Sequence, residues 1–323
     1  MHKVTVPGRW LWGLSGLVTA GALAIPGIHL ITFASVSQSV QPQPTMTRTV
    51  TVPQPVTSLT VQSYGMPVRV TAAAVRRVQV TETIEYDPQE GPPAVTQSVS
   101  GGRLTLADPA CSTSDCGVAF SVIVPRDVFV TVVTEGAPMI VSGTAGANLD
   151  SGGAPVQATA IHGPLTVNTE GDSLVLNGLT GPLDAGTGGG ELWAQDVDAG
   201  TATVITGGGD ARIAFAAPID TLIVSTDGGA ATLAVPGGPY ALTTDSDGGP
   251  EMVGIPVSST ARHSITVTSG GGPLVIEPRA ARLPVLPESI SPPEMAPLPD
   301  SAPMPEKPPL PGKAPPPESA SQP

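Results

Sequence analysis

The sequence predicts an all-β protein whose short strands stack as a β-solenoid between an apolar N-terminal segment and a proline-rich tail. Three observations predict this class. The 323 residues include 38 Gly and 38 Pro, which disfavours long helices over most of the chain. Glycine pairs recur at intervals near twenty residues between residues 136 and 270, as in a repeat protein. Apolar and polar residues alternate on both sides of each pair, which is the period of a half-buried strand.

The first 34 residues predict a single-pass membrane anchor. Residues 10–34 contain no Asp, Glu, Lys or Arg, and as a helix they would extend about 37 Å, enough to cross a hydrocarbon core of about 30 Å. Lys3 and Arg9 precede this transmembrane helix, so residues 1–9 are expected in the cytoplasm and the body outside the cell membrane. A cleaved signal peptide is the alternative, and it also exports the body.

Two further segments have compositions that do not support a packed core. Residues 35–55 are rich in Ser, Thr, Gln and Pro and are expected to form a linker. Residues 279–323 are dominated by Pro and are expected to form a disordered tail. Such a tail could also be a ligand for a domain that reads polyproline helices.

Residues 56–278 carry the repeats and are expected to form the solenoid domain. The first glycine of each turn is the most regular feature, and these turn glycines are Gly136, Gly152, Gly171, Gly188, Gly207, Gly228, Gly248 and Gly270. Less regular copies include Gly65 and Gly101. Glycine is expected here because it tolerates a positive φ at a sharp corner, and Asp or Thr beside it can cap the turn.

Stacking of the copies follows from their size. One copy offers about four large apolar side chains, worth roughly 6–12 kcal/mol when buried. Ordering about nineteen residues costs roughly 20–35 kcal/mol of backbone entropy. One copy therefore cannot fold alone, whereas stacked copies share strand hydrogen bonds and one core. The regular interval favours the solenoid over the alternative, an antiparallel meander in which each glycine pair is a hairpin turn.

Residues 56–126 read as the first turns of the stack and its N-terminal cap. They contain the only two cysteines, Cys111 and Cys116, in the sequence CSTSDC. In an exported protein this spacing predicts a local structural disulfide. A closed zinc site would need more ligands than these two residues provide.

The repeats resemble the bacterial putative-adhesin family of unknown function, related to GIN-type domains. The resemblance rests on SGG and TGGG turns set among alternating Val, Leu and Thr, on the single N-terminal membrane segment and on the exported body. It covers residues 56–278 and implies a right-handed parallel β-helix. It transfers no catalytic motif.

The composition and motifs argue against several classes of function. A net charge of −13 disfavours a nucleic-acid partner, because phosphate contacts need clustered Lys and Arg. No zinc-binding, nucleotide-binding or nucleophile-elbow motif occurs, and His162 and His263 are expected at coil edges. We therefore expect no enzyme activity and no cofactor.

A carbohydrate-active enzyme is the catalytic alternative. Two carboxylates facing one cleft would be needed, and the candidates are Asp227, Asp245, Asp247 and Glu251. Sugar sites usually add aromatic platforms, for which the repeats offer Trp193, Phe215 and Tyr240, with Arg212 as the only base suited to lyase chemistry.

Acidic residues beside the turns suggest a second hypothesis. If the copies stack, Glu135, Glu170, Asp210, Asp227 and Asp247 would form a loose column that could bind Ca²⁺ through carboxylate oxygens. The alternative is a solvated acidic edge that keeps the protein soluble.

Taken together, the sequence favours a membrane-anchored, non-enzymatic interaction protein of the cell surface or envelope. Its partner would be an envelope protein or a glycan, met through an extended face of the stack. An accessory protein that senses or regulates envelope stress is the second candidate.

Overall fold

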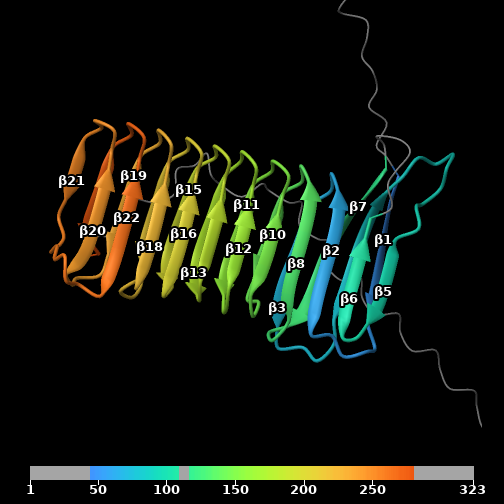
Figure 1. Ribbon diagram of the computed structural model, residues 1–323. Coiled ribbons are helices and arrows are strands. Elements are labelled where there is room, and N and C mark those ends of the chain that lie inside the picture. The colour runs from blue at the N-terminus through green and yellow to red at the C-terminus, as the bar shows by residue number, and fades with distance from the viewer. Residues whose placement is uncertain (1–43, 109–115, 280–323) are drawn as a thin grey trace, which may run out of the picture.

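The computed structural model describes residues 44–108 and 116–279, and every helix or strand among them is a β-strand (Figure 1). The predicted all-β class is thereby confirmed. The described residues include no helix of the length and apolarity that a bilayer crossing requires. Several predicted features lie outside the described residues: the cytoplasmic segment 1–9, the transmembrane helix 10–34, Cys111 and all but the first residue of the proline-rich tail.

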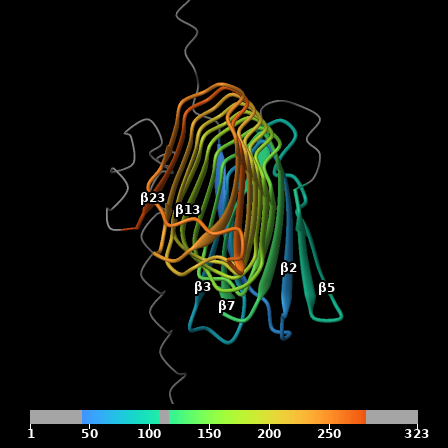
Figure 2. The same ribbon diagram turned by 60° about the vertical axis from the view of Figure 1, so that its left-hand side comes forward.

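The strands form two sheets that pack face to face (Figure 2). Sheet A, in spatial order, holds β1 (Thr45–Thr51), β4 (Gln79–Glu85), β7 (Gly117–Pro125), β3 (Val68–Ala73), β9 (Met139–Ser142), β11 (Val156–Ile161), β13 (Leu174–Thr180), β15 (Leu192–Asp198), β17 (Ala211–Phe215), β19 (Ala231–Val235), β23 (Leu274–Pro278) and β21 (Glu251–Val253). Sheet B holds β20 (Tyr240–Asp245), β22 (His263–Thr268), β18 (Thr221–Ser225), β16 (Thr201–Ile205), β14 (Leu183–Gly186), β12 (Leu165–Asn168), β10 (Ala147–Asp150), β8 (Phe129–Glu135), β2 (Ser58–Tyr64), β6 (Arg103–Ala107) and β5 (Thr96–Ser100).

From β8 to β19 the chain alternates between the sheets, and each strand pairs in parallel with the strand two places along. Leu165 of β12, for example, lies between Ala147 of β10 and Leu183 of β14. The pairing extends back to Val130 and on to Ala202 and Leu222, so one coil, a sheet B strand followed by a sheet A strand, takes 17 to 20 residues. Parallel pairing between coils excludes the antiparallel meander for this part of the chain, because hairpins would pair antiparallel.

The coils do not follow sequence order at the two ends, which corrects the expectation of a strictly successive stack. Strands β22 and β23 pair with β18 and β19, and the earlier strands β20 and β21 lie outside them. At the other end β2 and β3 lie inside β6 and β7 and contact β8 and β9. The first and last coils of the repeat region are therefore each covered by another coil.

Antiparallel strands close the N-terminal end. Strand β4 pairs antiparallel with β1 and β7, and β5 pairs antiparallel with β6. The expectation that residues 35–55 form an unpacked linker is wrong for 45–51, because β1 occupies them and Val52 is fully buried. Gly101 lies in the β5–β6 hairpin rather than in the corner shared by the repeats.

The core lies between the sheets and is built from the inward half of each alternating strand. Predicted core residues such as Val167, Leu176, Val224 and Leu233 are no more than 2% exposed. Each coil contributes a few aliphatic side chains that contact those of the coils on both sides, so the core is continuous along the stack.

Polar groups mark both ends of this core. At the N-terminal end Glu82 is fully buried, and its Oε2 accepts hydrogen bonds from Arg48 of β1 at 2.9 Å (Nε) and 2.6 Å (Nη2). At the other end Thr244 and Glu251 occupy inward-facing positions of the outermost coil, and Thr244 Oγ1 donates to Glu251 Oε2 at 3.2 Å. Charged and hydroxyl groups in inward positions disfavour addition of a further coil.

Candidate interaction surface

The corner at which a sheet B strand ends contains one buried hydroxyl in nine of the coils. These residues share one register position, immediately before the glycine turn, and we name them the hydroxyl column. In spatial order they are Ser63, Thr134, Ser151, Thr169, Thr187, Thr206, Thr226, Ser269 and Ser246. All nine are buried, because the position faces inward like the Val or Leu two residues before it.

Each hydroxyl donates to a backbone carbonyl within its own turn, three residues ahead. Thr134 Oγ1 lies 2.7 Å from the carbonyl oxygen of Ala137, and Ser269 Oγ lies 2.6 Å from that of Gly272. A second carbonyl on the neighbouring coil lies farther away in several corners, for example 3.2 Å between Thr134 Oγ1 and the oxygen of Ser151. The column therefore ties each turn to itself and to the next coil, which confirms the predicted capping by Thr.

Asp108 takes the tenth position of this register, one residue after the pairing of Ala107 with Gln62. It is 4% exposed, and its Oδ1 has no hydrogen-bond partner among the described residues. Its Oδ2 accepts a hydrogen bond from the Val118 N–H at 3.4 Å. Burial raises the pKa of the Asp108 carboxyl, and backbone hydrogen bonds offset part of that rise.

Two different physical requirements place glycine in the turn. All eight turn glycines have a positive φ, as predicted, and Asp or Glu takes the first turn position in some copies. The last glycine of the turn is required by stacking instead. A Cβ on Gly209 would lie 2.1 Å from the carbonyl oxygen of Gly190 on the neighbouring coil, which no side chain can occupy.

The structure does not gather the acidic residues that suggested a Ca²⁺ site. Glu135 and Glu170 are two coils apart, and so are Asp227 and Asp247, which corresponds to about 10 Å at a strand spacing of about 4.8 Å. Asp210 lies outside the corner and binds Arg212, with Oδ2 and Nη2 2.6 Å apart. Ca²⁺ needs six to eight oxygens at about 2.3–2.6 Å. Among the described residues, no three His, Cys, Asp or Glu side chains could share a metal ion.

The carboxylates considered for glycoside hydrolysis are near one end of the stack, but the aromatic residues are elsewhere. Asp245 accepts a hydrogen bond from the Asp247 N–H at 3.1 Å, and Glu251 accepts one from Thr244. Phe215 and Tyr240 are 0% and 1% exposed within the core, and Trp193 lies on the outer face of sheet A. No aromatic platform of this set lies beside the acidic residues.

The two histidines lie at coil edges, as expected. His162 is exposed in the turn after β11, and His263 begins β22. The Nδ1 atom of His263 lies 3.2 Å from Asp220 Oδ1, and its ring centroid lies 5.9 Å from that of Tyr240.

The outer face of sheet B carries a feature that the sequence reasoning missed. One outward register position runs through ten adjacent strands, and seven of its residues are threonine. We name this set the threonine row: Thr105, Thr60, Thr131, Asn148, Thr166, Asp184, Thr203, Ile223, Thr266 and Thr243. Nine strand intervals of about 4.8 Å make the row about 43 Å long.

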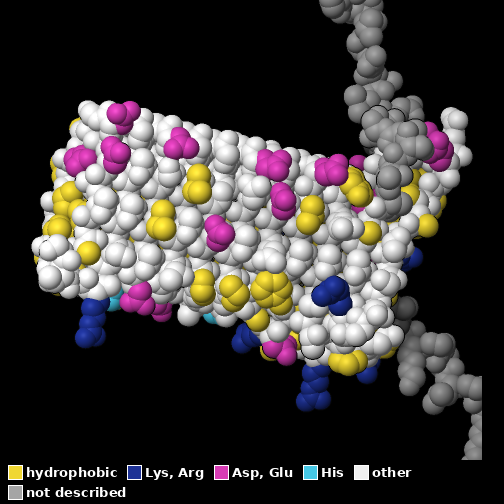
Figure 3. Space-filling model, in the orientation of Figure 1, with side chains coloured by type: hydrophobic (Ala, Val, Ile, Leu, Met, Phe, Trp, Pro, Cys, Tyr) yellow, Lys and Arg dark blue, Asp and Glu magenta, His cyan; other side chains and the backbone are white. Residues whose placement is uncertain are grey.

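This face has few charges. Asp184 is the only charged member of the threonine row. In the space-filling view most of the face is white, meaning uncharged polar side chains and backbone, and acidic side chains gather along its upper edge (Figure 3). The neighbouring outward positions include Val133 and Ile205, which are 38% and 49% exposed. The surface therefore combines regularly spaced hydroxyls with isolated apolar side chains.

A different count would have revealed both features in the sequence. Measured from Ser or Thr instead of from the first glycine, the corners at 134, 151, 169, 187, 206 and 226 recur at 17, 18, 18, 19 and 20 residues. The interval counted from Ser or Thr is more regular than the interval counted from the first glycine, because the first glycine occupies different turn positions in different copies. The threonine row appears when the strands are aligned on that residue.

The predicted Cys111–Cys116 disulfide stays a prediction, because Cys111 lies outside the described residues.

No family model matches the sequence, and no curated protein matches it. Solved structures similar to this chain include a putative adhesin from Parabacteroides merdae, which is 11% identical, has a TM-score of 0.39 and matches over 72% of this chain and 95% of that one. They also include a putative cell adhesion protein from Clostridium sporogenes (9% identity, TM-score 0.24, 73% and 100% of the chains) and a putative lipid binding protein from Parabacteroides distasonis (12%, 0.42, 72% and 96%). The names of these adhesins agree with the family that the repeats resemble. The fold described above does not depend on these similarities, because it was established from the strand pairing.

Proposed function

We propose that this protein is a non-enzymatic β-solenoid of the cell envelope that binds a repetitive glycan through the outer face of sheet B. The export and anchoring belong to the proposal and rest on the uncharged segment 10–34. The observation that carries it is the threonine row, in which seven of ten adjacent strands, about 4.8 Å apart, present a threonine hydroxyl at the same outward position.

The chemistry of the row suits a polysaccharide. A threonine hydroxyl both donates and accepts hydrogen bonds, as the hydroxyls of a sugar do. Exposed Val133, Ile205 and Ile223 add apolar contacts for the C–H faces of sugar rings. Each contact is weak, but many spaced contacts on one rigid face add through multivalency.

The test is binding of the full-length protein, in detergent, to insoluble polysaccharides of defined composition, such as cellulose, chitin and purified cell-wall sacculi. Saturable binding to at least one of them is expected. The double variant Thr166→Lys and Thr203→Lys places two bulky charges in the row and should abolish that binding.

Thr159→Lys is the matched control, because Thr159 is a half-exposed outward residue of sheet A. Its binding should equal that of the wild type. Equal loss in both variants, or no binding to any polymer, would refute the proposal. Release of reducing ends would indicate a carbohydrate-active enzyme instead, and co-purification of membrane proteins through residues 1–35 would indicate the regulatory alternative.

A further inference from the structure

The N-terminal end of the stack gathers arginines on the edge opposite the glycine turns. Strands β3 and β4 lie on either side of β7 in sheet A, so the turn that joins them, residues 74–78, crosses the end of β7. Arg76 and Arg77 belong to this turn, and Arg126 immediately follows Pro125, the last residue of β7. The strand order therefore brings three arginines together.

A fourth arginine lies on the same edge. Arg103 begins β6 and pairs with Ser58 of β2, which pairs in turn with Phe129 of β8. The short turn 126–128 joins β7 to β8, so the sheet B strands begin at the edge where β7 ends. We name these four residues, all of them exposed, the basic corner: Arg76, Arg77, Arg103 and Arg126.

The basic corner has no internal counter-charge. Among the described residues none of its four side chains forms an ion pair or a hydrogen bond, whereas Arg48, Arg212 and Arg279 each pair with a carboxylate. The two turns that carry three of the four arginines contain one acidic residue, Asp127. Neighbouring like charges repel one another, and an anionic partner would relieve that repulsion.

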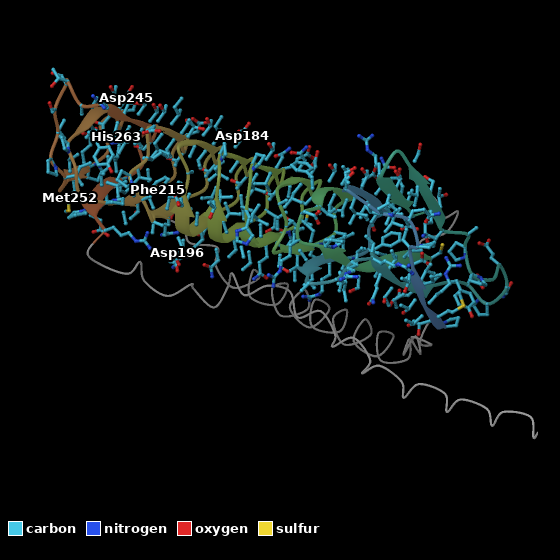
Figure 4. All side chains as sticks on the ribbon, turned by 90° about the horizontal axis from the view of Figure 1, so that it is seen from below. Asp184, Asp196, Phe215, Asp245, Met252 and His263 are labelled. Carbon is cyan, nitrogen blue, oxygen red and sulfur yellow. The ribbon has the colours of Figure 1, made fainter. Side chains whose placement is uncertain are left out.

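The charges of the stack are separated between its two edges. Acidic side chains gather along the upper edge in Figure 3, and arginine side chains lie along the lower edge, most of them at the N-terminal end. Figure 4 shows the stack from below, with Met252 and His263 labelled at the end opposite the basic corner. An anionic surface would therefore attract one edge at one end of the stack and repel the other edge.

We propose that the basic corner docks on the anionic lipid headgroups of the bilayer in which segment 10–34 is anchored, an inference that rests on the anchoring in the proposed function. The length of the chain favours this bilayer over a soluble polyanion. Nine residues, 35–43, separate the predicted helix from the described chain, and they span up to about 30 Å. Strand β1 covers about 20 Å from one edge to the other.

Strand β1 also ends beside the basic corner. Val52 follows it, and its N–H donates to the carbonyl of Val78, the residue after Arg77, at 2.9 Å. Because the nine residues span more than the width of the stack, the basic corner can reach the membrane surface. Docking would direct the acidic glycine-turn edge away from the bilayer and leave the threonine row accessible.

The test is energy transfer from the full-length protein to acceptor-labelled lipid in reconstituted vesicles. A fluorescent amino acid replaces either Gln54, which is exposed two residues after Val52, or Tyr64, which is exposed at the other end of β2. The vesicles contain phosphatidylcholine alone or with about one third phosphatidylglycerol. Transfer from position 54 should rise in the anionic vesicles more than transfer from position 64, and about 0.5 M salt should abolish the rise.

The variant Arg77→Gln, Arg126→Gln removes two charges from the basic corner. One arginine near an anionic membrane is worth roughly fivefold in the ratio of docked to undocked protein, so this variant should lower the ratio roughly thirtyfold. The matched control, Arg262→Gln, Arg279→Gln, removes two charges at the other end of the stack and should keep the rise.

Equal transfer in neutral and anionic vesicles would overturn the proposal, and so would an undiminished rise in the Arg77→Gln, Arg126→Gln variant. Equal transfer combined with retention on immobilised polyphosphate would identify a soluble polyanion as the partner and would also overturn it. Release of the protein by alkaline carbonate would show that the anchoring fails. Docking is then judged by flotation with the anionic vesicles, and flotation that does not depend on salt, or no flotation, would overturn it.

Discussion

The hydroxyl column makes a quantitative prediction for Thr206→Val. This change keeps the shape of the side chain and removes the hydroxyl that donates to the Gly209 carbonyl inside the core edge. Thr206 is 0% exposed, so water cannot replace the lost donor. A buried carbonyl left without its partner costs about 1–3 kcal/mol. For a domain of this size, about 2–4 °C per kcal/mol gives a fall in Tm of about 2–12 °C.

Two matched variants separate this effect from a general effect of the substitution. Thr203→Val changes the same residue type three residues earlier, on the half-exposed outer face of β16, and should alter the stability by less than about 0.5 kcal/mol. Thr206→Ser keeps the hydroxyl, as Ser151 and Ser269 do at the same register position, and should restore most of the stability. Chemical denaturation followed by far-UV circular dichroism measures all three. A Thr206→Val midpoint equal to that of Thr203→Val would refute the reasoning.

Three other predictions follow from single contacts. Gly209→Ala should prevent correct stacking, because its Cβ would lie too close to a carbonyl oxygen of the neighbouring coil. A Cβ at Gly208 would contact no neighbouring atom, so Gly208→Ala should cost only the strain of its positive φ, about 1–3 kcal/mol, measured by thermal denaturation. Asp108→Ser should raise the Tm at pH 7. Burial raises the pKa of the Asp108 carboxyl in the folded protein, so its contribution to stability is complete below the ordinary pKa and is lost as the pH rises through the folded pKa. The pH dependence of the Tm should therefore lack this part in the variant. Arg48→Met leaves the buried Glu82 carboxylate without its cation and should destabilise the fold by about 3–5 kcal/mol, an effect that Glu82→Gln in the same chain should largely remove.

The repeat region could be predicted well because its signals are local. Alternation identified the inward residues, and Val167, Val224 and Leu233 are buried as expected. The turn glycines have the positive φ that their position in a sharp corner requires. Parallel pairing followed from the constant interval, since equivalent residues of successive coils can pair only if the strands run the same way.

The ends could not be predicted from the interval, because turns with the same pattern can stack in more than one order. The turns beginning at Ser246 and Ser269 look alike, yet the second lies next to Thr226 and the first lies outside it. The polar residues Thr244 and Glu251 distinguish the outermost coil, but their inward position is known only from the register. Strand β1 was missed because its residues are mostly exposed and polar, so no apolar alternation distinguished it from a linker.

The interaction surface was missed for a different reason. Threonine is common in strands because its branched side chain fits the pleated sheet, so a single outward Thr carries no signal. The row appears only when register aligns strands such as β12, β14 and β16, and register is a property of the stack.

The distance between Thr166 and Thr203 tests this register most directly. Both belong to the threonine row, with Asp184 of the intervening strand between them. Two strand spacings predict a backbone separation of about 10 Å. Nitroxide labels at these two positions of the full-length protein should show strong dipolar broadening in the electron paramagnetic resonance spectrum, whereas unbroadened spectra would contradict the stacked register on which the column and the row depend.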